Sequence, residues 1–76
     1  MNLESLHLEV ARDFMKRKEY GRAFFHLVQV PVEISYNGLE ELSRSISKNP
    51  KYQEMQEVIN ELKANYPKKE TKQDGN

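Results

Sequence analysis

Apolar residues recur along the first part of the chain at the three- and four-residue spacing of one helix face. The residues of this stripe are Leu3, Leu6, Val10 and Phe14, with Ala11 and Met15 beside them. Charged residues fill most of the remaining positions, as in a helix with one apolar and one polar face. The pattern predicts a helix over residues 3–17 that ends near Lys18, where consecutive basic residues suit the negative end of the helix dipole.

The helical spacing returns after Glu19 and predicts a second, shorter helix. Its apolar residues are Tyr20, Ala23, Phe24, Leu27 and Val28. Pro31 limits the extent of this helix, because proline lacks the backbone N–H that a helix interior needs. The first two helices are therefore expected to form an antiparallel hairpin.

Residues 28–36 follow a different period. Apolar and polar residues alternate there with a period of two, which is the pattern of a strand. The apolar positions are Val28, Val30, Val32, Ile34 and Tyr36. Pro31 would restrict such a strand to a sheet edge, and a lone strand needs a partner inside or outside the chain. Asn37–Gly38 then predicts a turn.

The second half of the chain predicts two further helices. The first covers residues 39–48, and Asn49–Pro50 ends it, because a residue that precedes proline is pushed out of the helical region. Its apolar residues are Leu39, Leu42 and Ile46. The second covers residues 50–66 and is expected to end at Pro67, and its apolar residues are Tyr52, Met55, Val58, Ile59, Leu62 and Tyr66. The polar composition after Pro67 predicts a disordered tail over residues 67–76.

These patterns together predict a mainly α-helical fold. We expect a single domain over residues 3–66, built as a small bundle of three to four helices in hairpins, with residues 28–36 as a short extended segment, a loop or part of a helix. A chain of 76 residues has room for one domain, and domains this small bury only about 60% of their unfolded surface. The absence of cysteine excludes a disulfide framework and a thiolate zinc site.

The charge distribution excludes several classes of function. Twelve basic and twelve acidic residues give a formal net charge of zero, and residues 1–38 and 39–76 are each neutral as well. Neither half offers the positive surface that binds nucleic acid. The apolar runs are far shorter than the roughly 20 residues of a membrane-spanning helix, and the first residues lack the pattern of a secretory signal. We therefore expect a cytoplasmic protein.

Patterns that carry catalysis or bind metal are sparse. His7 and His26 belong to no set of three or four converging ligands, which a metal site normally needs. The serines lie in no glycine-rich elbow, and the three glycines form no phosphate-binding loop. We expect no enzymatic activity, no metal and no cofactor.

A surplus of apolar side chains around residues 25–36 indicates a binding surface. Phe24 and Phe25 are adjacent, so they cannot both face one core across a single short helix. Either Phe25 faces a partner or it packs beneath residues 28–36. We expect a non-enzymatic interaction module or small regulatory adaptor that binds another protein or a second copy of itself. The expected binding residues are Phe25, Val28, Val32, Ile34 and Tyr36.

Residues 7–30 resemble one unit of a tetratricopeptide repeat. The matching small and aromatic positions are Ala11, Phe14, Tyr20 and Ala23. The chain departs from the family at His7, Lys18 and Ser35, where the family has a large aromatic residue, a glycine and a proline. The resemblance implies a helical hairpin that stacks against neighbouring hairpins. An unrelated helical hairpin that satisfies the same packing rule is the alternative.

Two other resemblances lead to different functions. If residues 28–36 form a strand, this strand and the two helices after it follow the order of a ribbon-helix-helix dimer, a family that includes transcriptional regulators. Glu33 on such a strand opposes binding to DNA phosphates. Residues 46–52 and the helix after them are similar to a stretch of the small helical immunity proteins of bacteriocin producers.

Overall fold

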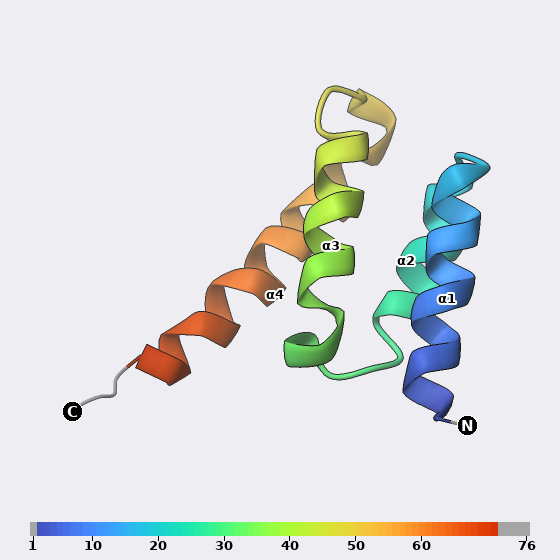
Figure 1. The fold of residues 1–76 in the computed structure, drawn as a ribbon. Coiled ribbons are helices and arrows are strands. Elements are labelled where there is room, and N and C mark those ends of the chain that lie inside the picture. The colour runs from blue at the N-terminus through green and yellow to red at the C-terminus, as the bar shows by residue number, and fades with distance from the viewer. Residues whose placement is uncertain (1, 72–76) are drawn as a thin grey trace.

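The structure, a computed structural model, describes residues 2–71, with side chains described as far as residue 66 (Figure 1). The elements in chain order are α1 (Leu3–Lys16), α2 (Tyr20–Leu27), α3 (Val32–Ile46), the short 3₁₀ helix η1 (Pro50–Tyr52) and α4 (Gln53–Thr71). Residues 2–71 contain no strand. The expected mainly α-helical bundle is therefore confirmed.

The helices form two successive hairpins. Figure 1 shows α1 and α2 running antiparallel beside α3, while α4 crosses behind α3 and diverges from it toward the C-terminus. α3 contacts both helices of the first hairpin as well as α4. The Cα atoms span 43 × 35 × 14 Å with a radius of gyration of 13.1 Å, whereas a compact domain of this length has about 11 Å. The bundle is thus thin and open, and its helices have much of their surface in solvent.

The first hairpin closes tightly because its centre is built from alanines. Ala11 of α1 and Ala23 of α2 are both fully buried, and side chains this small let two helices approach closely. The connection between the helices contains Lys18 at φ 64°, a left-handed conformation in which glycine is the usual residue. The antiparallel hairpin expected from the two apolar stripes is therefore present.

Of the three alternatives for residues 28–36, the extended segment is wrong, because residues 28–31 form a turn and loop and α3 already begins at Val32. The buried positions of α3 are Ser35, Leu39, Leu42 and Ile46, which keep the three- and four-residue spacing of a helix. Ser35 hides this period in the sequence, since a serine does not count as an apolar position. Its Oγ donates to the Pro31 carbonyl at 3.3 Å, which allows the side chain to be buried. Without a strand in the described residues, the chain does not have the ribbon-helix-helix arrangement.

The turn expected at Asn37–Gly38 is also wrong, because both residues lie inside α3. A Cβ atom on Gly38 would lie 2.8 Å from Cδ2 of the buried Leu27. Gly38 therefore allows α2 to pack closely against α3, and its conformational freedom is not used for a turn.

Of the helix ends predicted for the second hairpin, the break at Asn49–Pro50 agrees with the structure and the end at Pro67 does not. Asn49–Pro50 separates α3 from the next helical segment as predicted, and Asn49 Oδ1 accepts from the Lys51 N–H at 3.0 Å. α4 continues past Pro67 to Thr71, so the predicted end at Pro67 is wrong. Proline removes one backbone hydrogen bond from a helix, and a helix can continue through it at that cost. Residues 72–76, the last part of the predicted tail, lie outside the described residues.

Candidate functional site

The first hairpin has two faces, and α3 lies against one of them. On α1, Leu8 and Met15 line a hollow that is shared with Ile34 and Gly38 of α3. At 3.6 residues per turn, Leu3, Leu6 and Val10 lie on the opposite side of α1. α1 thus carries two apolar stripes, of which only the first faces the core.

α2 presents an aromatic side chain to the same outer side of the hairpin. Phe25 lies more than half a turn from Leu27, which faces the core and is fully buried. The exposed fractions are 57% for Phe25, 66% for Leu3 and 41% for Leu6. α1 begins and α2 ends at the same end of the hairpin (Figure 1). We call Leu3, Leu6, Val10 and Phe25 the outer face.

A histidine pair joins the two helices within this face. Nδ1 of His7 on α1 and Nδ1 of His26 on α2 lie 3.1 Å apart, and both side chains are half-buried. In a pair of neutral imidazoles, one Nδ1 donates its proton and the other accepts through its lone pair. Two phenyl rings border the His26 ring. Phe14 stacks on it at 5.8 Å between centroids, and Phe25 meets it edge-on at 5.4 Å.

Basic groups lie at the other end of the hairpin and are paired with acidic ones. The guanidinium groups of Arg17 and Arg22 lie over the Phe14 ring at 5.8 and 5.9 Å from its centroid. Arg17 pairs with Asp13 at 2.9 Å, and Arg22 pairs with Glu19 at 3.5 Å. These pairs are well exposed, so each contributes little to stability. They also balance the local charge, which leaves apolar contact as the main property of the outer face.

The five residues predicted to bind a partner do not form one surface. Phe25 lies on the outer face. Val28 and Val32 border a cavity of about 70 Å³ together with Leu62 of α4. Ile34 lines the hollow between α1 and α3, and Tyr36 packs against the Tyr66 ring at 5.4 Å between centroids. A strand would have placed alternate residues on one side, whereas a helix turns them to different sides.

The sequence interpretation missed Leu3, Leu6 and the histidine pair as parts of a surface. The sequence did contain a signal for the two leucines. Leu8, Ala11 and Met15 are enough to form the core-facing stripe of α1, so further leucines on this helix are expected to face away from the core. The histidines are 19 residues apart, and only the register of the hairpin brings them together.

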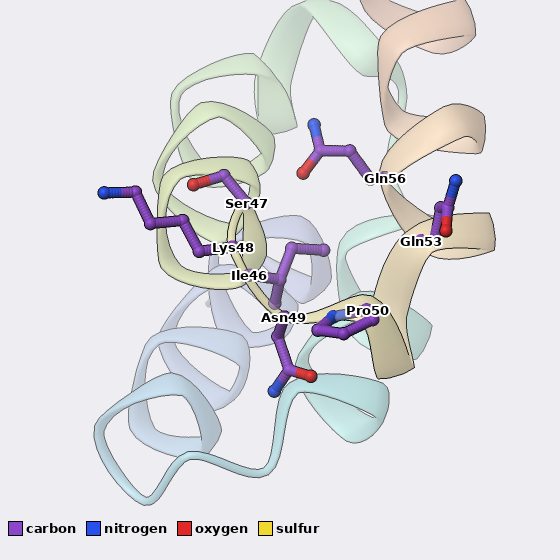
Figure 2. Close-up of a pocket in the computed structure, with 7 residues that line it drawn as sticks. All are labelled: Ile46, Ser47, Lys48, Asn49, Pro50, Gln53 and Gln56. Carbon is purple, nitrogen blue, oxygen red and sulfur yellow. The ribbon is translucent and has the colours of Figure 1, made fainter.

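A second hollow of about 350 Å³ lies at the turn between α3 and α4 (Figure 2). Figure 2 shows the Gln56 carboxamide leaning from α4 toward α3. Its Nε2 donates to Ser43 Oγ and to Asn60 Oδ1, while its Oε1 is buried without a partner among the described residues. The lining residues are Ile46, Ser47, Lys48, Asn49, Pro50, Gln53 and Gln56. This hollow contains no carboxylate, histidine or cysteine for catalysis.

The described residues contain neither a cluster of metal ligands nor a membrane-spanning helix. No group of three or more His, Cys, Asp or Glu side chains is placed to hold a metal ion. No helix in residues 2–71 combines the length and the apolar character needed to cross a membrane.

Comparison with family models, curated proteins and solved structures finds no match for the chain. The outer face, with its histidine pair, is therefore the candidate functional site.

Proposed function

We propose that the protein is a non-enzymatic interaction module, a small adaptor or regulator, whose outer face binds an apolar helix of a partner protein. The observation that carries this proposal is the exposure of Phe25 and Leu3, at 57% and 66%, on a hairpin whose other face packs against α3. Exposed aromatic and large aliphatic side chains are the usual anchors of protein interfaces.

The size of the exposed apolar surface supports the proposal. A fully exposed large side chain presents about 150–250 Å², so Leu3, Leu6 and Phe25 leave on the order of 300 Å² in contact with water. Apolar patches of about 300–600 Å² are the largest on typical monomers and are often functional. A standard interface covers about 800 Å² on each partner, of which somewhat more than half is apolar. The outer face would supply most of that apolar share.

The way α3 packs on the first hairpin indicates what kind of partner would fit. α3 contacts both α1 and α2, as a helix does when its side chains fill the groove between two others. A partner helix on the outer face would repeat this arrangement on the side of the first hairpin that faces away from α3. The resemblance of residues 7–30 to a tetratricopeptide unit agrees with this, because hairpins of that family stack on both sides.

Photo-crosslinking tests the proposal by position. A photoreactive phenylalanine is placed at position 6 or 25 of the outer face, or at 34 or 58 as controls, and the crosslinked protein is identified and purified. Ile34 is the matched control for Leu6, because the two side chains are 39% and 41% exposed but lie on different surfaces. Val58, on α4, is 43% exposed and serves as a second control. We expect crosslinks from positions 6 and 25 only.

Binding of the purified partner then decides the outcome. Phe25→Ser and Leu6→Ser are expected to weaken binding by about 2 kcal/mol, or roughly thirtyfold, while Ile34→Ser and Val58→Ser leave it unchanged. Equal crosslinking from all four positions, or equal affinity of all four variants, would contradict the proposal. Sedimentation of the isolated chain shows whether the partner is a second copy.

A further inference from the structure

We propose that His7 and His26 form a two-nitrogen chelating site for a divalent transition metal of the Zn²⁺, Ni²⁺ and Cu²⁺ class. The metal would bind to Nδ1 of both imidazoles and would connect α1 to α2. This inference rests on the geometry of the histidine pair and does not depend on the proposed binding of a partner protein.

The distance between the two nitrogens fits a shared metal ion. Imidazole nitrogens bind Zn²⁺ at about 2.0–2.1 Å. With Nδ1 atoms 3.1 Å apart, a metal at that distance from both would have an N–metal–N angle of about 100°. This angle lies between the right angle of octahedral sites and the wider angle of tetrahedral ones. The separation of the two donors therefore suits a shared metal ion, and the two rings, whose centroids lie 5.3 Å apart, must turn so that both Nδ1 lone pairs converge on it.

The chemistry of the donors selects the class of metal. Neutral imidazole suits Zn²⁺, Cu²⁺ and Ni²⁺, whereas Mg²⁺ and Ca²⁺ prefer oxygen ligands. In the metal-free pair, the Nδ1–H of one imidazole donates a hydrogen bond to the Nδ1 lone pair of the other. On metal binding, that imidazole carries its proton on Nε2 instead, so that both Nδ1 lone pairs face the metal. The neutral pair thus binds the metal without a net loss of protons.

The surroundings of the pair define how the rest of the coordination sphere is filled. No third His, Cys, Asp or Glu among the described residues joins the two histidines. Since both rings are only half-buried, water can reach the metal and fill the remaining positions. Phe14 and Phe25 restrict the His26 ring on two sides. Because the protein supplies only two donors, we expect weaker binding than at a four-ligand structural zinc site.

Metal binding should stabilise the first hairpin. The two histidines are 19 residues apart in sequence, so the unfolded chain does not hold them together. A ligand that binds the folded state alone raises its stability according to the ligand concentration. In a chain of this length, we expect saturating Zn²⁺ to raise the Tm by at least about 4 °C.

The test is titration of the full chain with Zn²⁺ by isothermal calorimetry, together with Tm measurements and ¹⁵N NMR of the imidazoles. The variants are His7→Asn and His26→Asn, and Glu54→Gln on the exposed surface of α4 is the control. We expect one Zn²⁺ per chain, a movement of both Nδ1 resonances, and more than about tenfold weaker binding in each histidine variant. Glu54→Gln should bind Zn²⁺ as the unmodified chain does.

Three results would overturn the proposal. The first is no Zn²⁺ binding by the unmodified chain at about millimolar concentration, which corresponds to only about 4 kcal/mol of binding free energy. The second is unchanged affinity in both histidine variants. The third is movement of the Nε2 resonances alone, which would indicate that each imidazole binds metal separately at its exposed edge. The NMR result applies to the unmodified chain, so it decides the question even if a histidine variant fails to fold.

Discussion

The first hairpin, α1–α2, and the second, α3–α4, differ in the side chains that hold them together. The first is centred on Ala11 and Ala23 and buries two larger side chains, Met15 and Leu27, whereas the second buries more large aliphatic side chains. The fully buried aliphatic residues of the second hairpin are Leu39, Leu42, Ile46 and Ile59, three of them on α3. Since stabilisation increases with the apolar area removed from water, the second hairpin contributes the larger share of the core.

The two hairpins also differ in what they leave exposed. The first hairpin exposes Leu3, Leu6, Phe25 and Val28 at the end where α1 begins and α2 ends, while the second exposes Ile34 and Val58 on different helices. Each hairpin has a polar pair between its helices, His7–His26 in the first and Ser43–Gln56 in the second. Only the first pair has an exposed aromatic ring, that of Phe25, packed against it. The comparison indicates that the second hairpin maintains the fold, and that the first presents a surface for binding.

The largest expected effect is from truncation in the second hairpin. Leu42→Ala removes part of a fully buried side chain and is expected to lower the free energy of unfolding by about 2–5 kcal/mol. A small domain with marginal stability would then be partly unfolded at room temperature. Urea denaturation followed by circular dichroism measures the change. Val58→Ala, at a position 43% exposed, is the control and should change stability by less than about 0.5 kcal/mol. Equal effects of the two variants would contradict the place of Leu42 in the core of the second hairpin.

A smaller effect is expected where the two hairpins meet. Gly38→Ala places a Cβ 2.8 Å from Leu27 Cδ2, so this buried side chain must move, and overpacking of this kind costs about 1–3 kcal/mol. The gain in helix propensity offsets about 1 kcal/mol of that cost. Gly21→Ala in α2 is the matched control, because a Cβ there meets nothing within 4 Å, and it should be neutral or stabilising. If Gly38→Ala is as stable as Gly21→Ala, the close packing of α2 on α3 is wrong.

The smallest effect concerns the start of α1, which carries the leucines of the outer face. Asn2 Oδ1 accepts from the Glu4 N–H at 2.9 Å and from the Ser5 N–H. Asn2→Ala removes this cap and is expected to cost about 1 kcal/mol. Amide hydrogen exchange should become faster in the first turn of α1 only. Asn49→Ala, which removes the equivalent contact to Lys51, should instead affect the start of the second hairpin's last helix. Faster exchange throughout the chain in Asn2→Ala would show that α1 does not open independently.

The sequence predicted those parts of the fold in which the spacing of apolar residues along the chain matches the residues that are buried in the structure. The first hairpin followed from the apolar stripes and from the small residues at 11 and 23. The break at Asn49–Pro50 followed from the conformational restriction that proline places on its neighbour. The first turn of α3 was missed, because the β-branched residues at 28–34 imitate a strand while the buried Ser35 conceals the helical period. Tertiary packing decided that segment, and local propensity did not.

The candidate site was only partly predictable for a related reason. The adjacent Phe24 and Phe25 correctly suggested that one aromatic ring faces outward, and Phe25 is the exposed one. The other predicted binding residues were grouped by a strand period that the chain does not adopt. The histidine pair depends on which turn of α2 lies opposite which turn of α1, and that register is set by the connection at Lys18 and by the alanine contact.

The most direct test of the account compares Phe25→Ser with Ile34→Ser, two apolar-to-polar changes at exposed positions on different faces of the molecule. The measurement is the dissociation constant of each variant for the partner that is crosslinked at position 25. We predict binding roughly thirtyfold weaker for Phe25→Ser than for Ile34→Ser, with circular dichroism showing that both variants are folded under the conditions of the binding measurement. Equal dissociation constants for the two variants would contradict the claim that the outer face of the first hairpin is the binding surface.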